Sequence, residues 1–187
     1  MFKILAALLK EQANLTDDEL ELVQAFTITK RLRKKQYLLQ EGNICDYNYF
    51  VVKGCLRSYR VGEDGVEHML GFGVENWWMG DLVSNHIGIP SKNNIDAIED
   101  SELLLIRKVD FNKLVDKISN FRIFNDQLNA SNVDANLTRI MSYISDTSEE
   151  RYKDFVKSFP KIYNRVPLYM IASYLGLSRE TLTRIRA

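Results

Sequence analysis

A short segment near the C-terminal end carries side chains suited to the recognition of base edges. Its polar residues Arg179, Glu180, Thr183 and Arg184 recur at helical spacing. Arginine can bridge O6 and N7 of guanine, glutamate can accept a hydrogen bond from N4 of cytosine, and a threonine methyl can contact the methyl of thymine. We therefore expect a helix here that reads DNA in the major groove.

Charge is distributed unevenly along the chain. The whole sequence holds 25 basic and 25 acidic residues, and this balance gives no support for nucleic-acid binding. From residue 161 onward, however, five basic residues stand against the single acid Glu180: Lys161, Arg165, Arg179, Arg184 and Arg186. A locally basic end favours contact with phosphates. We expect Ser178 and Arg186 to complete the DNA-binding set, with Arg186 near a phosphate.

The segment that must position these side chains has the pattern of a helix-turn-helix. Gly176 can adopt the positive φ of the turn, and Ala172 is small enough for a close helix crossing. Ser178 is a good N-cap for the second helix, and Pro167 suits the first turn of the first helix. Inward-facing apolar positions complete the pattern at Ile171, Leu175, Leu177, Leu182 and Ile185. The alternative is a plain helical hairpin with a solvated charged face.

A long helix is predicted before this motif, from about Ile118 to Ser145. Phe121, Phe124 and Leu128 form one apolar stripe. A second stripe at steps of 4, 3 and 4 consists of Val133, Leu137, Ile140 and Ile144. A long, narrow apolar seam is typical of a dimerising helix. The alternative is a helix that packs on its own domain.

The middle of the chain, residues 37–107, has the pattern of an antiparallel β domain. Short β-rich runs are separated by turn signals such as Gly42-Asn43 and Lys53-Gly54. Their spacing suggests a closed sandwich or barrel. Residues 1–30 are predicted to be helical, with Thr16 and Glu19 forming a capping box. Trp77-Trp78 is interpreted as core at a strand end, with a ligand contact or an inter-domain contact as the alternatives.

Several motifs resemble the cyclic-AMP receptor protein and fumarate-nitrate regulator (Crp/Fnr) family of bacterial transcription regulators. Ser178–Ile185 closely resembles its recognition helix, and Tyr49–Arg57 is similar to its "Y-x-V-x-x-G-x-[LV]-R" strand pair. Met79–Leu82 is similar to its "G-E-L" turn, and Ile95–Leu104 to the strand after its phosphate-binding turn.

The resemblance implies an α+β fold with three parts. These are residues 1–117 with the N-terminal helices and a cyclic-nucleotide-binding-like β-roll (jelly roll), residues 118–146 with the dimerisation helix, and residues 147–187 with the helix-turn-helix. Because the sequence stops at Ala187, we expect the wing of this winged-helix type to be reduced or absent. The implied partners are double-stranded DNA with an inverted-repeat operator, a second copy of the chain, and RNA polymerase.

The same resemblance locates an effector pocket. It implies contacts from Gly80, Asp81, Leu82, Ser91, Lys92 and Asn93. Asp81 stands where the family has a ribose-binding Glu, Ser91 where it has the phosphate-binding Arg, and Lys92 where it has the Ser. A bidentate arginine is the usual partner of a buried phosphate. We therefore expect no ordinary cyclic AMP binding and leave open another small effector, or none.

Other chemistries fit the sequence less well. Cys45 and Cys55 are too few for an iron–sulfur cluster and are interpreted as reduced thiols of a cytoplasmic protein. His68 and His86 are the two histidines, and this scarcity argues against a metal-dependent cupin, which needs a cluster of His and carboxylate ligands. A metal-dependent cupin-like or small-molecule-binding protein with a helical tail is kept as the alternative function. We expect no enzyme activity, no metal, no certain cofactor and no membrane segment, because no apolar run approaches the roughly 20 residues of a span.

Overall fold

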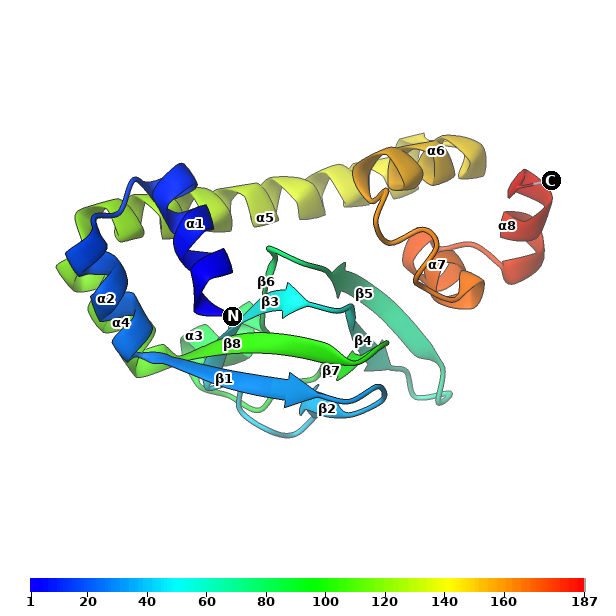
Figure 1. Cartoon of the computed structure of the whole chain (residues 1–187). Helices are drawn as coiled ribbons and strands as arrows, with labels where there is room; N and C mark the ends of the chain where they lie inside the picture. The colour runs from blue at the N-terminus through cyan, green and yellow to red at the C-terminus, as the bar shows by residue number, and fades with distance from the viewer. Residues whose placement is uncertain (187) are drawn as a thin grey trace.

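The computed structural model describes residues 1–186; Ala187, the end of the predicted C-terminal part, lies outside the described residues. The chain begins with two helices, continues through a β-rich middle, and ends in helices (Figure 1). The helices are α1 (Phe2–Ala13), α2 (Asp17–Ala25), α3 (Leu82–Ile87), α4 (Lys108–Lys117), α5 (Ser119–Ser145), α6 (Ser148–Ser158), α7 (Leu168–Leu175) and α8 (Arg179–Arg186).

Within residues 1–186, eight strands form two antiparallel sheets that face each other as a β-roll. One sheet has the order β1-β8-β3-β6 and the other has the order β2-β7-β4-β5. The strands are β1 (Thr27–Leu32), β2 (Tyr37–Leu39), β3 (Tyr47–Lys53), β4 (Leu56–Val61), β5 (Glu67–Gly73), β6 (Trp78–Met79), β7 (Asn94–Ala97) and β8 (Ser101–Arg107). Among residues 1–186, no helix combines the length and the apolarity that crossing a membrane requires.

Alternation along β3 and β8 builds two of the three apolar cores. Successive side chains of a strand point to opposite faces of the sheet. Phe50 of β3 and Leu104 of β8 therefore pack with α1, α2, α4 and the start of α5, whereas Val51 and Leu103 pack between the sheets. The N-terminal helices and the first turns of α5 thus cover one face of the roll.

The third core joins the β-roll to the C-terminal helices. Phe72 of β5 lies against Phe155 of α6 and Tyr174 of α7, with ring centroids 6.5 and 5.5 Å apart. Buried residues of β4, β5 and the loop after β7 share a continuous cluster with Ile162, Ile171 and their neighbours. Residues 148–186, which we call the head, contain α6, α7 and α8 and therefore pack directly on the roll.

Most elements lie where the sequence predicted them, with two corrections. Residues 1–30 are not helical throughout, because β1 begins at Thr27 and pairs with β8. The helix α3 was not predicted. The capping box of Thr16 and Glu19 is confirmed.

The two tryptophans have different surroundings. Trp78 packs in the core against Phe50 and Phe111, as predicted. Trp77 is 39% exposed, and its ring lies 5.5 Å from that of Phe159 in the head. Trp77 is therefore an inter-domain contact, which was the alternative interpretation of this pair.

Candidate DNA-binding surface and sensor site

The turn between α7 and α8 has the geometry that its sequence predicts. Gly176 has φ +65° and ends α7, and the backbone N–H of Leu177 donates to the carbonyl of Ala172 at 2.9 Å. Ser178 then caps α8, because its Oγ accepts a hydrogen bond from the N–H of Thr181 at 3.1 Å. Pro167 is the N-cap of α7, one position before the predicted first turn. These local bonds fix where α8 starts.

Packing beneath the two helices fixes how α8 is turned. Ile171, Ala172 and Leu182 are at most 2% exposed, and Leu175 is also buried. Ala172 has the small side chain that a close crossing of two helices requires. With Leu182 directed inward, the neighbouring Thr183 and Arg184 face solvent.

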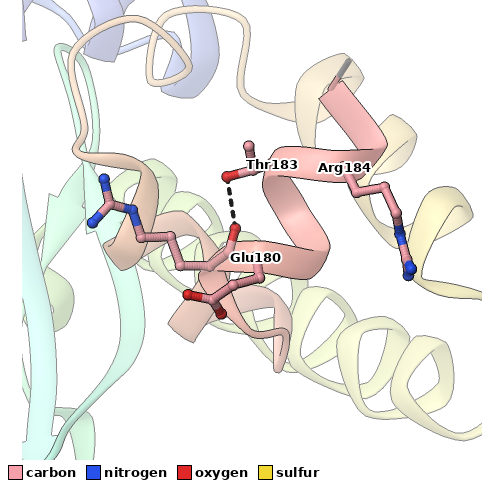
Figure 2. Close-up of a pocket in the computed structure, with 4 residues that line it drawn as sticks. Glu180, Thr183 and Arg184 are labelled. Atoms are coloured by element: carbon pink, nitrogen blue, oxygen red, sulfur yellow. Dashed lines mark hydrogen bonds between the residues drawn. The ribbon is translucent and has the colours of Figure 1, made fainter.

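The four predicted base-reading residues of α8 line one shallow hollow of about 410 Å³. Arg179, Glu180, Thr183 and Arg184 are all exposed. Figure 2 shows the tips of Glu180 and Arg184 pointing apart, with Thr183 between them along the helix. The hydroxyl of Thr183 donates to the carbonyl of Arg179 at 2.8 Å. Its hydrogen is thus used within the helix, and the methyl group is the part left for an apolar contact.

The remaining basic residues of the head differ in whether their side chains are available to contact DNA. Arg186 is exposed, and its guanidinium carbon lies 4.7 Å from the centre of the Tyr163 ring. Lys161 is exposed as well. Arg165 instead binds Glu75 and Glu99 of the roll, at 2.8 and 2.5 Å. One of the five basic residues counted in the sequence is therefore engaged within the protein.

The predicted effector residues surround a carboxylate that the protein itself satisfies. Asp81 is the N-cap of α3 and accepts hydrogen bonds from the N–H groups of Val83 and Ser84, at 3.1 and 3.0 Å. Its second oxygen accepts from Ser91 Oγ at 2.7 Å and from Asn93 Nδ2 at 3.0 Å. Asp81 and Ser91 are 9% and 3% exposed. The two residues therefore bind each other in the positions where the family resemblance implies ligand contacts.

The other residues of that set divide between interior and surface. A Cβ on Gly80 would lie 3.7 Å from the carbonyl oxygen of Tyr47, which is ordinary contact distance. Leu82 is 53% exposed and Lys92 is exposed too. The adjacent interior of the roll is occupied by Cys45 and Tyr49, and burial raises the pKa of both. The structure thus brings Asp81, Ser91 and Asn93 together and leaves Leu82 and Lys92 at the surface.

Two clusters of charged residues were not identified from the sequence. In the first, Arg57 forms ion pairs with Asp96 at 2.8 Å and with Glu67 at 2.5 Å. The second is the Arg165–Glu75–Glu99 cluster, in which the guanidinium lowers the pKa of Glu75 to about 2. Its members come from distant parts of the sequence, so no local pattern indicates it.

Among residues 1–186, no three or more His, Cys, Asp or Glu residues gather where they could hold a metal ion.

Comparison with known proteins first defines the class of the β-roll. Residues 29–117 match the family model of the cyclic nucleotide-binding domain. This stretch runs from β1 through α4 and includes Asp81 and Ser91. The β-roll is therefore similar to a cyclic nucleotide-binding domain. No curated protein matches the chain.

Solved structures extend the likeness to nearly the whole chain. FixK2 from Bradyrhizobium japonicum is 20% identical with a TM-score of 0.74, and the match covers 86% of this chain and 82% of FixK2. A regulator from Eubacterium rectale assigned to the Crp/Fnr family is 19% identical with a TM-score of 0.70, covering 92% and 82%. The catabolite activator protein of Thermus thermophilus is 20% identical with a TM-score of 0.59, covering 92% and 82%. The predicted resemblance to Crp/Fnr regulators is confirmed in the fold.

Proposed function

We propose that the chain is a cytoplasmic, homodimeric transcription regulator that binds double-stranded DNA through α8 and has no enzymatic activity. One observation carries the proposal: four side chains of suitable chemistry share the exposed face of a helix whose start is fixed by local hydrogen bonds and whose rotation is fixed by packing. The fold shared with solved regulators supports it. We retain the division into residues 1–117, 118–146 and 147–187 as part of the proposal.

Each residue on α8 has a proposed role. Arg179 and Arg184 donate to guanine, and Glu180 accepts from cytosine. The methyl of Thr183 contacts a thymine methyl, since its hydroxyl is bonded to the carbonyl of Arg179. Ser178 and Arg186 flank this set, and Arg186 contacts a phosphate from the last turn of α8. Phosphate contacts position a protein on DNA, whereas base contacts give it sequence preference.

The proposed dimer forms along α5. The buried side chains of this 27-residue helix are Phe121 and Phe124, both near its start. Beyond them the apolar seam is exposed to solvent, between 52% and 73% for its four members Val133, Leu137, Ile140 and Ile144. Met141 beside it is 57% exposed. A second copy of α5 packed on this seam would bury these side chains, as in a coiled coil.

We also propose that the roll does not bind cyclic AMP tightly. Ser91 replaces the expected arginine, and its hydroxyl already binds Asp81. A phosphate would have to break that bond and would lack a bidentate partner, at a cost of about 1.5–3 kcal/mol for each lost charge-assisted bond. Calorimetric titration should show no affinity in the micromolar range or tighter. If the titration instead showed micromolar or tighter binding of cyclic AMP, a Lys92→Ala variant would test whether Lys92 holds the phosphate.

The proposed function is tested by DNA binding of the full chain. Fluorescence anisotropy with a labelled random-sequence duplex at low salt should show saturable binding. An Arg179→Ala/Arg184→Ala variant should bind more weakly, because two cations of the α8 face are removed. A Lys3→Ala/Lys30→Ala variant removes two exposed charges elsewhere and should bind as the wild type does. Equal loss in both variants, or no binding by the wild type, would refute the proposal.

A further inference from the structure

A cleft of about 540 Å³ lies between the β-roll and the head, apart from the Asp81 site. Its walls come from the turn between β1 and β2, from β4 and β7, and from the start of α7. Small-molecule sites have volumes of roughly 300–1,000 Å³ and occur preferentially at domain interfaces. The cleft has the size and the location of such a site.

The two domains supply an apolar surface for a ligand body. Ala97 and Ile98 come from the roll, and Pro167 and Met170 from the head. Tyr169, at the start of α7, also lines the cleft and is 50% exposed. An aromatic ring and aliphatic side chains therefore face the same space from both sides.

The charges that line the cleft are unequally matched. Its carboxylates are already paired, Asp96 and Glu67 with Arg57, and Glu99 with Arg165. The cleft also has two lysines, Lys34 and Lys35, and both are exposed. Within residues 1–186, neither lysine forms an ion pair with an acidic residue. Lys34 and Lys35 are thus the two charged side chains of the cleft lining that no ion pair engages.

The backbone holds the lysine turn against the floor of the cleft. The N–H of Lys34 donates to Asp100 Oδ1 at 2.8 Å, and the N–H of Lys35 donates to the carbonyl of Ala97 at 2.7 Å. Lys35 adopts φ +69°, a conformation that is uncommon outside glycine, asparagine and aspartate. The two ammonium groups therefore extend from an anchored turn next to the apolar surface.

We propose that this cleft binds a small organic anion, with its charged group at Lys34 and Lys35 and its apolar body against Tyr169, Pro167 and Met170. Arg165 lines the same cleft and joins the head to the roll through Glu75 and Glu99. A ligand there contacts both domains and stabilises one arrangement of the head. This last step rests on the proposed function, because the head must bind DNA for its arrangement to regulate anything.

The test uses anilinonaphthalene sulfonate, an anion with an aromatic body, as the probe for the full chain. NMR amide shifts followed during titration should change at Lys35, Ala97, Ile98 and Met170. A Lys34→Met/Lys35→Met variant should bind the probe about tenfold more weakly or worse, because it removes the charged partners but not the apolar surface. A Lys30→Met/Lys53→Met variant is the matched control and should bind as the wild type does.

Two results would overturn the proposal. One is a set of shifts confined to the seam of α5, which would place the probe on the exposed apolar stripe. The other is unchanged affinity in the Lys34→Met/Lys35→Met variant. DNA affinity measured on the same samples separates the two proposals. If the protein binds the probe at the cleft but does not bind DNA, the proposed function is refuted. If it binds DNA but does not bind the probe, the proposed anion site is refuted.

Discussion

At the scale of single residues, Glu180 is the most informative member of the α8 face. It is the one acidic residue among those that line the α8 hollow, and it is exposed. Near the phosphate backbone a carboxylate opposes binding to any sequence, because DNA is an anion. Its presence is accounted for if it accepts a hydrogen bond from a cytosine N4 group.

We expect Glu180→Ala to relax discrimination at one base pair. The variant should lose about 1–3 kcal/mol of preference at that position and retain its preference elsewhere. Affinities for a set of duplexes with single base-pair changes would measure this. Glu63→Ala, an exposed turn substitution in the β-roll, is the control. A uniform change across all sequences would contradict a base-reading role for Glu180.

Glu75 illustrates how a single residue connects the domains. It binds Arg165 of the head through both carboxylate oxygens, and it also accepts from the N–H of Gly54 at 2.9 Å. The guanidinium of Arg165 lowers the pKa of Glu75 from 4.5 to about 2. Because the folded-state pKa is lowered, the carboxylate stabilises the fold above pH 4.5 and loses that effect as the pH falls toward 2.

We therefore expect the effect of Glu75→Gln to depend on pH. At pH 7 the variant should have a lower free energy of unfolding than the wild type. The difference should shrink between about pH 4.5 and about pH 2, as the wild-type carboxylate becomes protonated. Urea denaturation at a series of pH values would measure it. A difference that stays constant with pH would mean that the ion pair contributes nothing.

At the scale of elements, α5 carries an apolar seam that its sequence predicts and that one copy of the chain leaves uncovered. The seam at Val133, Leu137, Ile140 and Ile144 was evident from its spacing, and the structure leaves it exposed. Exposed apolar stripes of this kind are typical of surfaces that a partner covers. We propose a second copy of the chain as that partner.

We expect Leu137→Glu to dissociate the proposed dimer. A carboxylate at the centre of an apolar seam would have to be buried without a partner, and this is costly. Sedimentation at micromolar concentration should give a dimer for the wild type and a monomer for the variant, with unchanged helix content because Leu137 is exposed within one chain. Ser131→Glu, on the opposite side of α5, should remain dimeric. A wild-type monomer that still binds DNA specifically would refute this interface.

The elements that sequence reasoning missed have identifiable causes. The strand β1 has the sequence T-I-T-K-R-L at the edge of its sheet, and it is mostly exposed, so it lacks the apolar alternation of a half-buried strand. The helix α3 has six residues, too few for a helical period to stand out. Its signals were nevertheless present, since Asp81 caps its start and Gly88 with φ +79° follows its end.

At the scale of the whole molecule, the head and the roll are joined by contacts that no local pattern contains. Arg165 and Glu75 are 90 residues apart, and Ser173 of α7 accepts a hydrogen bond from the N–H of Met69, 104 residues away. The helix-turn-helix was predictable because its constraints fall within one short segment. The attachment of the head was not, because it depends on tertiary packing between distant residues.

In the proposed complex, two copies of the chain present two α8 helices to DNA. Selection of duplexes from a random library by the full-length protein tests this most directly. We expect an inverted repeat whose half-site centres lie about 34 Å apart, one helical turn. Within each half-site, one to three G·C pairs should be enriched opposite Arg179, Glu180 and Arg184. Recovery of no enriched sequence, or of an asymmetric site without a repeat, would contradict it.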